Sequence, residues 1–257
     1  MLPFETALDQ LLALAEPLPS RDIAIADCAG LVLAAPHAAR LTQPPADVSA
    51  MDGYALRFAD LPGPLRVVGE SAAGAPFPAA IGAGEACRIF TGAEVPAGAD
   101  TVAVQEDARL EGDALSFPES GPPGIGAHIR RRGIDFAAGD AIAGAGERIT
   151  PARLGLLASA GLTQVRAHPR PRVAILSTGS ELVPPGALPG PGQIVGANGL
   201  MIAELLREAG AEVHDLGILP DRLETITAAI AAAQPFDLLI TIGGASVGDH
   251  DLVRPAL

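Results

Sequence analysis

Hydrophobic residues change their spacing twice along this chain of 257 residues. Near the start, Leu8, Leu11 and Leu12 recur at helical spacing, which predicts an amphipathic helix over residues 3–16. Residues 46–136 carry short apolar runs between glycine and proline turns, a spacing typical of the strands of a small barrel or sandwich. After residue 171 the pattern alternates between strand and helix, as in a doubly wound sheet.

These patterns predict individual elements. We expect strands over 65–68, 86–90, 101–105 and 114–117, and a helix that begins after Thr150 as N-cap and ends at Gly161. Beyond the stiff segment 168–171, we expect strands at 172–176, 212–216 and 237–242 and helices at 199–209 and 223–233. The run 237–242 has the composition of a strand buried on both faces. A three-stranded parallel sheet would leave such a strand at an edge, so we expect a longer parent protein.

The sequence therefore predicts a multidomain protein of the α/β plus β class. A β-rich, barrel-like domain is expected to be inserted in a linker domain and followed by a partial doubly wound α/β domain. The expected boundaries are 1–43 and 137–168 for the linker domain, 44–136 for the β-rich domain and 169–257 for the incomplete α/β domain. The helix over residues 3–16 is a candidate for packing on the α/β domain.

Composition narrows the class of partner. A net charge of −13 argues against nucleic acid or an anionic membrane as a partner, because the protein would repel both electrostatically. The chain has no apolar run long enough for a membrane span and starts without a basic signal-peptide segment, so we expect a cytoplasmic protein. Cys28 and Cys87 lack partners at zinc-ligand spacing and are expected to be reduced core thiols.

The stretch 237–251 is the strongest candidate for chemistry. Gly243, Gly244 and Gly248 let the backbone take positive φ, so that successive N–H groups form a cup for an oxyanion. Asp249 and Asp251 add carboxylates, the hard ligands that Mg²⁺ takes beside a phosphate. A turn with solvated acids explains this loop equally well when it is considered alone.

Four further loops concentrate polar groups. Asp52 lies in a Ser49–Ala55 loop, where a local Asx bond is the likelier role on local grounds, and Thr91 follows a strand. The arginines 130–132 precede Asp135 and either meet anions or form a solvated stripe. Residues 177–182 follow the first strand of the α/β part, where a phosphate would bind. Asp221 fits a capping box with Glu224 at least as well as a catalytic role.

Five motifs in order, SAMDGYA, IFTGA, RRRGID, STGSEL and TIGGASVGDHD, resemble the MoeA-type molybdopterin molybdenumtransferases, the family of gephyrin. The resemblance implies that adenylylated molybdopterin and molybdate are substrates and that Mg²⁺-dependent pyrophosphate cleavage releases AMP. It also implies a homodimer, whose cleft combines Asp52, Thr91 and Asp135 of one subunit with Glu181, Asp221 and Asp251 of the other. The molybdopterin adenylyltransferase is a candidate partner.

Site residues are carried over position by position. The family's catalytic acids and hydroxyl fall on Asp52, Thr91, Asp135, Glu181, Asp221 and Asp251. The expected ligand-binding residues are Ser177, Thr178, Gly179, Gly243, Gly244, Ser246, Gly248, Asp249, Arg130 and Arg132. The expected Mg²⁺ ligands are Glu181, Asp221, Asp249 and Asp251.

The chain departs from the family pattern at three positions, where Ser180 replaces Asp, Ile134 replaces Glu and Gly199 replaces Ser. Two other functions are weighed beside molybdenum insertion. Adenylyl transfer to molybdopterin is suggested by the α/β part. A free-standing enzyme of that type does not need residues 1–168, which argues against this alternative. A gephyrin-like scaffold with a non-catalytic pocket is the alternative from another class.

Overall fold

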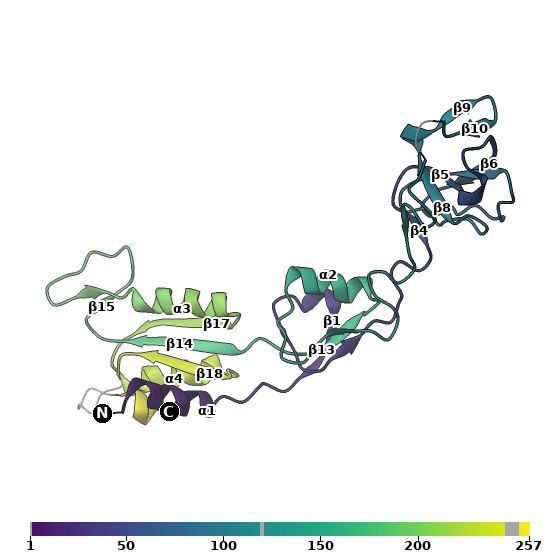
Figure 1. Cartoon of the computed structure of the whole chain (residues 1–257). Coiled ribbons are helices and arrows are strands. Elements are labelled where there is room, and N and C mark those ends of the chain that lie inside the picture. The colour runs from purple at the N-terminus through teal and green to yellow at the C-terminus, as the bar shows by residue number, and fades with distance from the viewer. Residues whose placement is uncertain (1, 119–120, 245–251) are drawn as a thin grey trace. The chain divides into compact units, whose positions relative to one another are not determined.

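The computed structural model describes residues 2–118, 121–244 and 252–257 (Figure 1). The chain divides into two compact units. Unit 1 comprises residues 1–35, 145–151 and 164–257, and unit 2 comprises residues 36–144 and 152–163. The domain boundaries expected from the sequence remain a prediction, and each unit is described by itself.

Unit 1 contains a parallel sheet of three strands in the order β17-β14-β18. The central strand β14 (Arg172–Thr178) is buried from its second residue onward, between β17 (Glu212–Leu219) and β18 (Leu238–Ile242). Leu176 packs with Ile226 and Ile230 of helix α4 (Leu223–Ala233), whereas the next residue, Ser177, approaches Gly199 of helix α3 (Asn198–Ala209). Because neighbouring strand residues point to opposite faces, the two helices cover opposite faces of the sheet.

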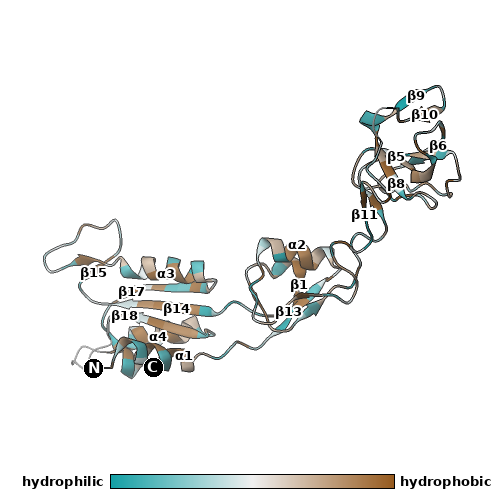
Figure 2. Ribbon diagram, viewed as in Figure 1, coloured by the Kyte–Doolittle hydropathy of each residue, from teal (hydrophilic) through white to brown (hydrophobic). Residues whose placement is uncertain are grey.

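The position of β18 corrects one expectation. The strand was predicted to be buried on both faces, but all of its residues are exposed or half-buried. The reason is its place at the edge of the sheet, where it pairs with β14 on one side. The fully buried apolar run belongs to β14 instead. Figure 2 shows both strands as largely hydrophobic ribbon, so hydropathy alone does not separate the centre from the edge.

Unit 1 also holds a small antiparallel sheet and short connections. Strand β13 (Gln164–His168) pairs with β1 (Arg21–Ala24) and β2 (Val32–Leu33). The remaining elements are η1 (Ile25–Asp27), the parallel pair β15 (Leu182–Val183) and β16 (Ile194–Val195), and α5 (Val253–Ala256).

Helix α1 (Phe4–Ala13) is shorter than expected and contains no buried residue. The predicted apolar stripe is present, but Leu11 and Leu12 are 66% and 62% exposed. The helical periodicity is therefore confirmed, whereas the packing of this helix on the α/β domain remains a prediction.

Unit 2 is built on a sheet of six strands in the order β8-β5-β7-β6-β10-β9. Its strands are β5 (Gly53–Leu56), β6 (Leu65–Ser71), β7 (Glu85–Ile89), β8 (Thr101–Val104), β9 (Arg109–Glu111) and β10 (Ala114–Ser116). Apolar side chains on its two faces form two cores, one around Ile89 and one around Leu56. The sheet mixes directions, because β6 runs parallel to β7 while the other ladders are antiparallel.

Shorter elements complete unit 2. They are β3 (His37–Ala38) with β12 (Ala141–Ala143), β4 (Val48–Ser49) with β11 (Ile129–Arg130), η2 (Phe58–Asp60), η3 (Gln105–Asp107) and most of helix α2 (Pro151–Ser159). Across the described ranges, the structure contains no helix with the length and apolarity needed to cross a membrane.

Both cysteines are buried and unpaired, which confirms the prediction of core thiols. Burial raises the pKa of the Cys87 thiol to about 11. At neutral pH this thiol is therefore protonated and packs as a small apolar side chain.

Candidate functional site

The first cluster of predicted residues forms at one end of the unit 2 sheet. Asp52 immediately precedes β5 and Thr91 follows β7. Because these strands are antiparallel neighbours, the start of one lies beside the end of the other. The Asp52 Oδ1 accepts the Thr91 backbone N–H at 2.8 Å and the Thr91 hydroxyl at 2.9 Å. The fold thus joins two residues that are 39 positions apart in the sequence.

These bonds argue against the local Asx role weighed for Asp52, and its catalytic role remains a prediction. Of the hydrogen bonds that the described residues give its carboxylate, both come from Thr91 and none is the local Asx bond. The backbone N–H of Thr91, its hydroxyl and the nearby Arg88 guanidinium lower the pKa of Asp52. The carboxylate is therefore ionised at neutral pH, and both bonds use Oδ1, which leaves Oδ2 for a ligand.

A second group lines a hollow of about 380 Å³ in the same unit. The Arg130 Nη2 donates to both Asp135 oxygens at 3.1 and 3.3 Å, and the two side chains lie at the wall of the hollow with Gly92. Glu94 lines it too, although it was not predicted from the sequence. Its position directly after the IFTGA motif was the only available signal.

The other two arginines meet carboxylates or carbonyls of the protein itself. Arg131 Nη1 donates to Asp47 Oδ2 at 2.6 Å, the Arg132 backbone N–H donates to Asp47 Oδ1 at 2.8 Å, and Arg132 Nε donates to the Pro45 carbonyl at 3.0 Å. At least part of this arginine cluster therefore pairs with a carboxylate of the protein itself. The role of Arg130 and Arg132 in binding a ligand remains a prediction.

Asp47 supplies a testable dependence of stability on pH. The Arg132 backbone N–H first, and then the Arg131 side chain, lower the pKa of Asp47 from its ordinary value of 3.8. A lowered folded-state pKa means that the stabilisation is present above the unfolded value and is lost as pH falls through the folded one. We expect Asp47→Asn to be less stable than wild type at pH 7 in urea unfolding. The difference should shrink as the pH falls below about 3.8, and a difference that grew with acid would contradict this assignment.

In unit 1, predicted residues gather where β14 ends. Ser177 and Thr178 are the last residues of β14, and both are buried. Asp221 follows β17, the parallel neighbour of β14, so both strands lead to the same edge of the sheet. The Asp221 Oδ2 accepts the Ser180 N–H at 2.9 Å and the Ser180 hydroxyl at 3.2 Å. This geometry fits the departure at position 180, because an aspartate there would place a second carboxylate beside Asp221.

The capping box proposed for Asp221 does not form. The N-cap of α4 is Arg222, which makes no side-chain cap bond, and the Asp221 carboxylate accepts hydrogen bonds from Ser180 instead. The sequence contains the capping-box pattern, an acid followed by a glutamate three residues later. The position of the Asp221 carboxylate is instead determined by its contact with the loop that carries Ser180.

The turn after β18 closes on the same strand end. Gly243 and Gly244 have φ values of +90° and +64°, as predicted for a turn that exposes N–H groups. A Cβ on Gly243 would lie 2.5 Å from the Thr178 carbonyl oxygen, and one on Gly244 would lie 3.0 Å from Thr178 Oγ1. That hydroxyl is buried and, in the described structure, has no hydrogen-bond partner. The glycine turn therefore packs closely against Thr178, which only residues without a side chain allow.

A hollow of about 330 Å³ adjoins this strand end. Ser177, Gly199, Asp215 and Gly217 are among its lining residues. A Cβ on Gly199 would lie 3.0 Å from Ser177 Oγ, so glycine at this departing position keeps room near the hydroxyl. Gly199 and Asp215 were not among the predicted ligand-binding residues, and their separate places in the sequence gave no signal that they meet.

Four predicted residues, Ser246, Gly248, Asp249 and Asp251, lie outside the described residues. Glu181 is described, and its carboxylate lies against Gly179, where an added Cβ would meet it at 2.8 Å. Among residues 2–118, 121–244 and 252–257, no three Asp, Glu, His or Cys side chains come together as a metal-binding group. Glu181 and Asp221 remain as carboxylate donors at the carboxyl edge of the parallel sheet.

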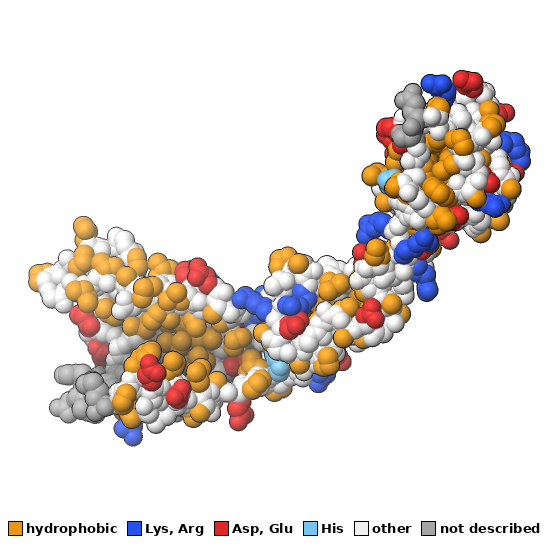
Figure 3. Space-filling model, viewed as in Figure 1, with side chains coloured by type: hydrophobic (Ala, Val, Ile, Leu, Met, Phe, Trp, Pro, Cys, Tyr) orange, Lys and Arg blue, Asp and Glu red, His pale blue; other side chains and the backbone are white. Residues whose placement is uncertain are grey.

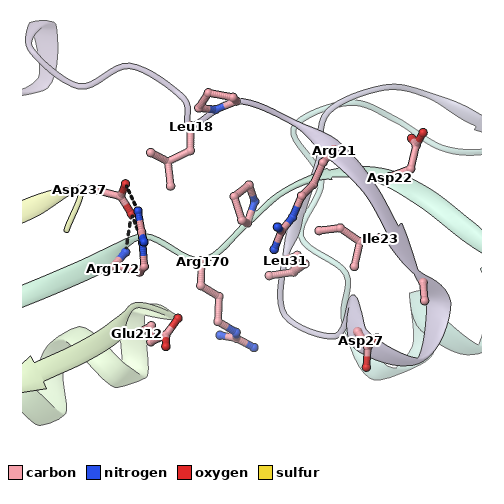
Figure 4. A pocket seen from close by; sticks show the side chains of 13 residues that line it. Leu18, Arg21, Asp22, Ile23, Asp27, Leu31, Arg170, Arg172, Glu212 and Asp237 are labelled. Atoms are coloured by element: carbon pink, nitrogen blue, oxygen red, sulfur yellow. Dashed lines mark hydrogen bonds and ion pairs between the residues drawn. The ribbon is translucent and has the colours of Figure 1, made fainter. Parts of the chain in front are cut away.

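A larger hollow, about 890 Å³, lies elsewhere in unit 1 (Figure 4). Arg172, Glu212 and Asp237 line it at the amino ends of β14, β17 and β18, and Arg172 is paired with Asp237. In open parallel sheets, ligands bind at the carboxyl ends of the strands. The described predicted residues of unit 1 gather at that opposite end, so we assign the candidate site of unit 1 there and not to the larger hollow.

Two family models match this chain. A family model described as the MoeA N-terminal region (domain I and II) matches residues 2–161, and a model described as a probable molybdopterin binding domain matches residues 174–257. Of the curated relatives, a molybdopterin molybdenumtransferase of Haemophilus influenzae is 38% identical over 100% of this chain and 64% of its own length. One from Nostoc is 40% identical over 89% of this chain and 54% of its own length.

A solved structure supports the fold. The molybdopterin biosynthesis MoeA protein from Pyrococcus horikoshii matches with a TM-score of 0.76 and 30% identity, over 100% of this chain and 66% of that one. The chain thus spans just over half to about two thirds of the length of these proteins.

Proposed function

The chain belongs to the MoeA family, and from this membership and the two clusters we propose that it is a molybdopterin molybdenumtransferase of molybdenum cofactor biosynthesis. It would take adenylylated molybdopterin and molybdate and release AMP. The observation that carries the proposal is the Asp52–Thr91 pair, an ionised carboxylate with one oxygen already held and the other left for a substrate.

The unit 1 cluster is suited to the pyrophosphate of such a substrate. Glycines at positive φ present backbone N–H groups to an oxyanion at the turn 243–244. The buried hydroxyl of Thr178 lies beside this turn and can donate a hydrogen bond to a phosphate oxygen. These neutral donors matter because a chain with a net charge of −13 otherwise repels an anion.

Mg²⁺ fits the acids at this edge. The ion commonly uses one or two protein carboxylates, substrate phosphates and water, and does not require a cage of protein ligands. Asp221 has Oδ1 left over from its bonds to Ser180, and Glu181 follows in the same loop. We propose these two carboxylates as its ligands, with Asp249 and Asp251 as further candidates from the sequence. When bound, the ion would lower the negative charge on the pyrophosphate.

Asp52 is suited to the proton transfers of molybdenum insertion. A dithiol and molybdate combine to give a molybdenum bound by two sulfurs and three oxygens, with loss of one water. Two thiol protons must therefore reach one leaving oxygen. Thr91 holds one oxygen of the ionised Asp52 carboxylate. The other carboxylate oxygen can accept a proton from a thiol and pass it to the leaving oxygen of molybdate. We propose this role for Asp52, with Thr91 as its positioning partner.

We further propose that the protein acts as a homodimer in the cytoplasm. Two unpaired cysteines fit a reducing compartment. Apolar residues on the surface support an interface, since Leu200, Met201 and Leu205 of α3 are all more than half exposed. Figure 3 shows hydrophobic side chains over α3 and the neighbouring β15 region. Sedimentation over a range of concentrations should give a dimer, and a monomer at every concentration would contradict this part of the proposal.

The function itself is tested by the products. The purified protein should release AMP from adenylylated molybdopterin when Mg²⁺ and molybdate are present, and the product should activate a molybdenum-free acceptor enzyme. The Haemophilus influenzae relative, treated in the same way, serves as the positive control. Consumption of ATP with free molybdopterin would support adenylyl transfer instead. If this protein shows neither activity while the control is active, the scaffold alternative is favoured.

A further inference from the structure

Arg88 is a half-buried cation beside Asp52 that no sequence motif singled out. It lies on β7 directly across from Tyr54 of β5. Its guanidinium carbon is 5.1 Å from the centroid of the Tyr54 ring and 4.8 Å from that of the Phe90 ring. Two aromatic neighbours restrict the orientation of the planar group and favour its positive charge.

The same guanidinium bonds to the backbone of Gly53 and to the side chain of Gln105. Nη1 donates to the Gly53 carbonyl oxygen at 2.9 Å, and Nη2 donates to the Gln105 Oε1 at 2.5 Å. The Gln105 backbone N–H in turn donates to the Asp52 carbonyl oxygen at 3.1 Å. One side chain therefore holds Gly53 directly and Asp52 through Gln105.

A purely structural role explains these contacts less well. The strands β5, β7 and β8 are already joined by backbone ladders, and the apolar cores on both faces of the sheet do not include Arg88. One bond of the guanidinium reaches Gly53, the residue after Asp52, and the other reaches Gln105, whose backbone N–H donates to the Asp52 carbonyl oxygen. Its charge also acts on the Asp52 carboxylate, in addition to the two bonds from Thr91.

We propose that Arg88 is a positioning residue for the Asp52 site. The two hydrogen bonds of its guanidinium hold the Asp52 loop in one conformation. In this conformation Thr91 binds Oδ1 of Asp52, and Oδ2 is left for the substrate. The inference rests on the function proposed above, because it assigns Arg88 to the reaction in which Asp52 takes part.

The test compares Arg88→Gln and Arg88→Lys with Arg66→Gln in the whole protein. Arg66 is the matched control, since it lies on the same sheet and pairs with Glu85 at 2.5 Å, outside the contacts around Asp52. We expect Arg88→Gln to lower kcat for molybdenum insertion about tenfold, the cost of a lost charge-assisted fork, with KM changed far less. Lysine keeps the charge but cannot make both bonds, so Arg88→Lys should recover little of the rate.

A second measurement needs no substrate. The Thr91 amide donates to Asp52 Oδ1, so its hydrogen exchange reports the position of the loop. We expect exchange at Thr91 to be about tenfold faster in Arg88→Gln, with the amide of Val102 in the core unaffected. Wild-type exchange and kcat in Arg88→Gln, an equal change in Arg66→Gln, or full rescue by lysine would each overturn the proposal. If wild type itself inserts no molybdenum, the proposed function fails, while exchange at Thr91 still tests whether Arg88 holds the loop.

Discussion

Replacing Asp52 by alanine should reduce the rate of molybdenum insertion by about a hundredfold or more, the usual scale for losing a positioned acid–base group. The carboxylate is ionised, and Thr91 holds Oδ1 through two hydrogen bonds, so Oδ2 has a defined position when substrate binds. An alanine side chain cannot take part in the proposed proton transfer. The measurement is the initial rate of active cofactor formation at saturating molybdate.

Two further variants separate chemistry from folding. Asp52→Asn keeps an oxygen that can accept both Thr91 bonds but cannot take up a proton in the same way, so it should be nearly as slow as Asp52→Ala. Asp113→Ala removes an exposed acid at the β9–β10 turn of the same unit and should leave the rate unchanged. Wild-type activity in Asp52→Asn would remove Asp52 from the proposed chemistry.

Replacing Gly53 by alanine should have the largest effect on stability. An added Cβ would lie 1.9 Å from the carbonyl oxygen of Ala103 and 2.9 Å from its carbonyl carbon. These are backbone atoms of β8, which pairs with β5 along its length, so neither strand can move without breaking the ladder. Overpacking against backbone should cost about 3 kcal/mol or more. Chemical denaturation followed by far-ultraviolet circular dichroism measures this loss.

Gly124→Ala is the matched control for Gly53→Ala. It lies in the same unit, and an added Cβ there would meet no atom within 4 Å. Its unfolding free energy should stay close to that of wild type. Equal stability of the two variants would contradict the close approach of β5 and β8 that places Asp52 at the end of the sheet.

The sequence predicted elements well where local pattern and burial agree. Residues 223–233 form α4 as expected, and α3 begins one residue earlier than predicted. Strand β14 runs two residues further than expected, because Ser177 and Thr178 continue the buried strand despite their hydroxyls. The exposure of α1 could not be predicted, since an apolar stripe is the same in sequence whether or not a partner covers it.

The candidate site was predictable as a set of loops but not as a set of contacts. Positive φ at Gly243 followed from its residue type, whereas the bonds from Ser180 to Asp221 depend on two loops that meet only in the folded sheet. Arg88 and Glu94 were missed for the same reason. Each lies within or next to an apolar strand motif, and neither spacing nor charge pattern marked it.

The most direct test of the whole account is a hybrid protein made from one Asp52→Ala subunit and one Asp221→Ala subunit. Each homodimer alone should be nearly inactive in molybdenum insertion. If the two clusters serve one substrate across a subunit boundary, random reassociation should restore about a quarter of the wild-type rate, because half of the dimers are hybrids and each keeps one intact site. A mixture no more active than its two parents would contradict the account.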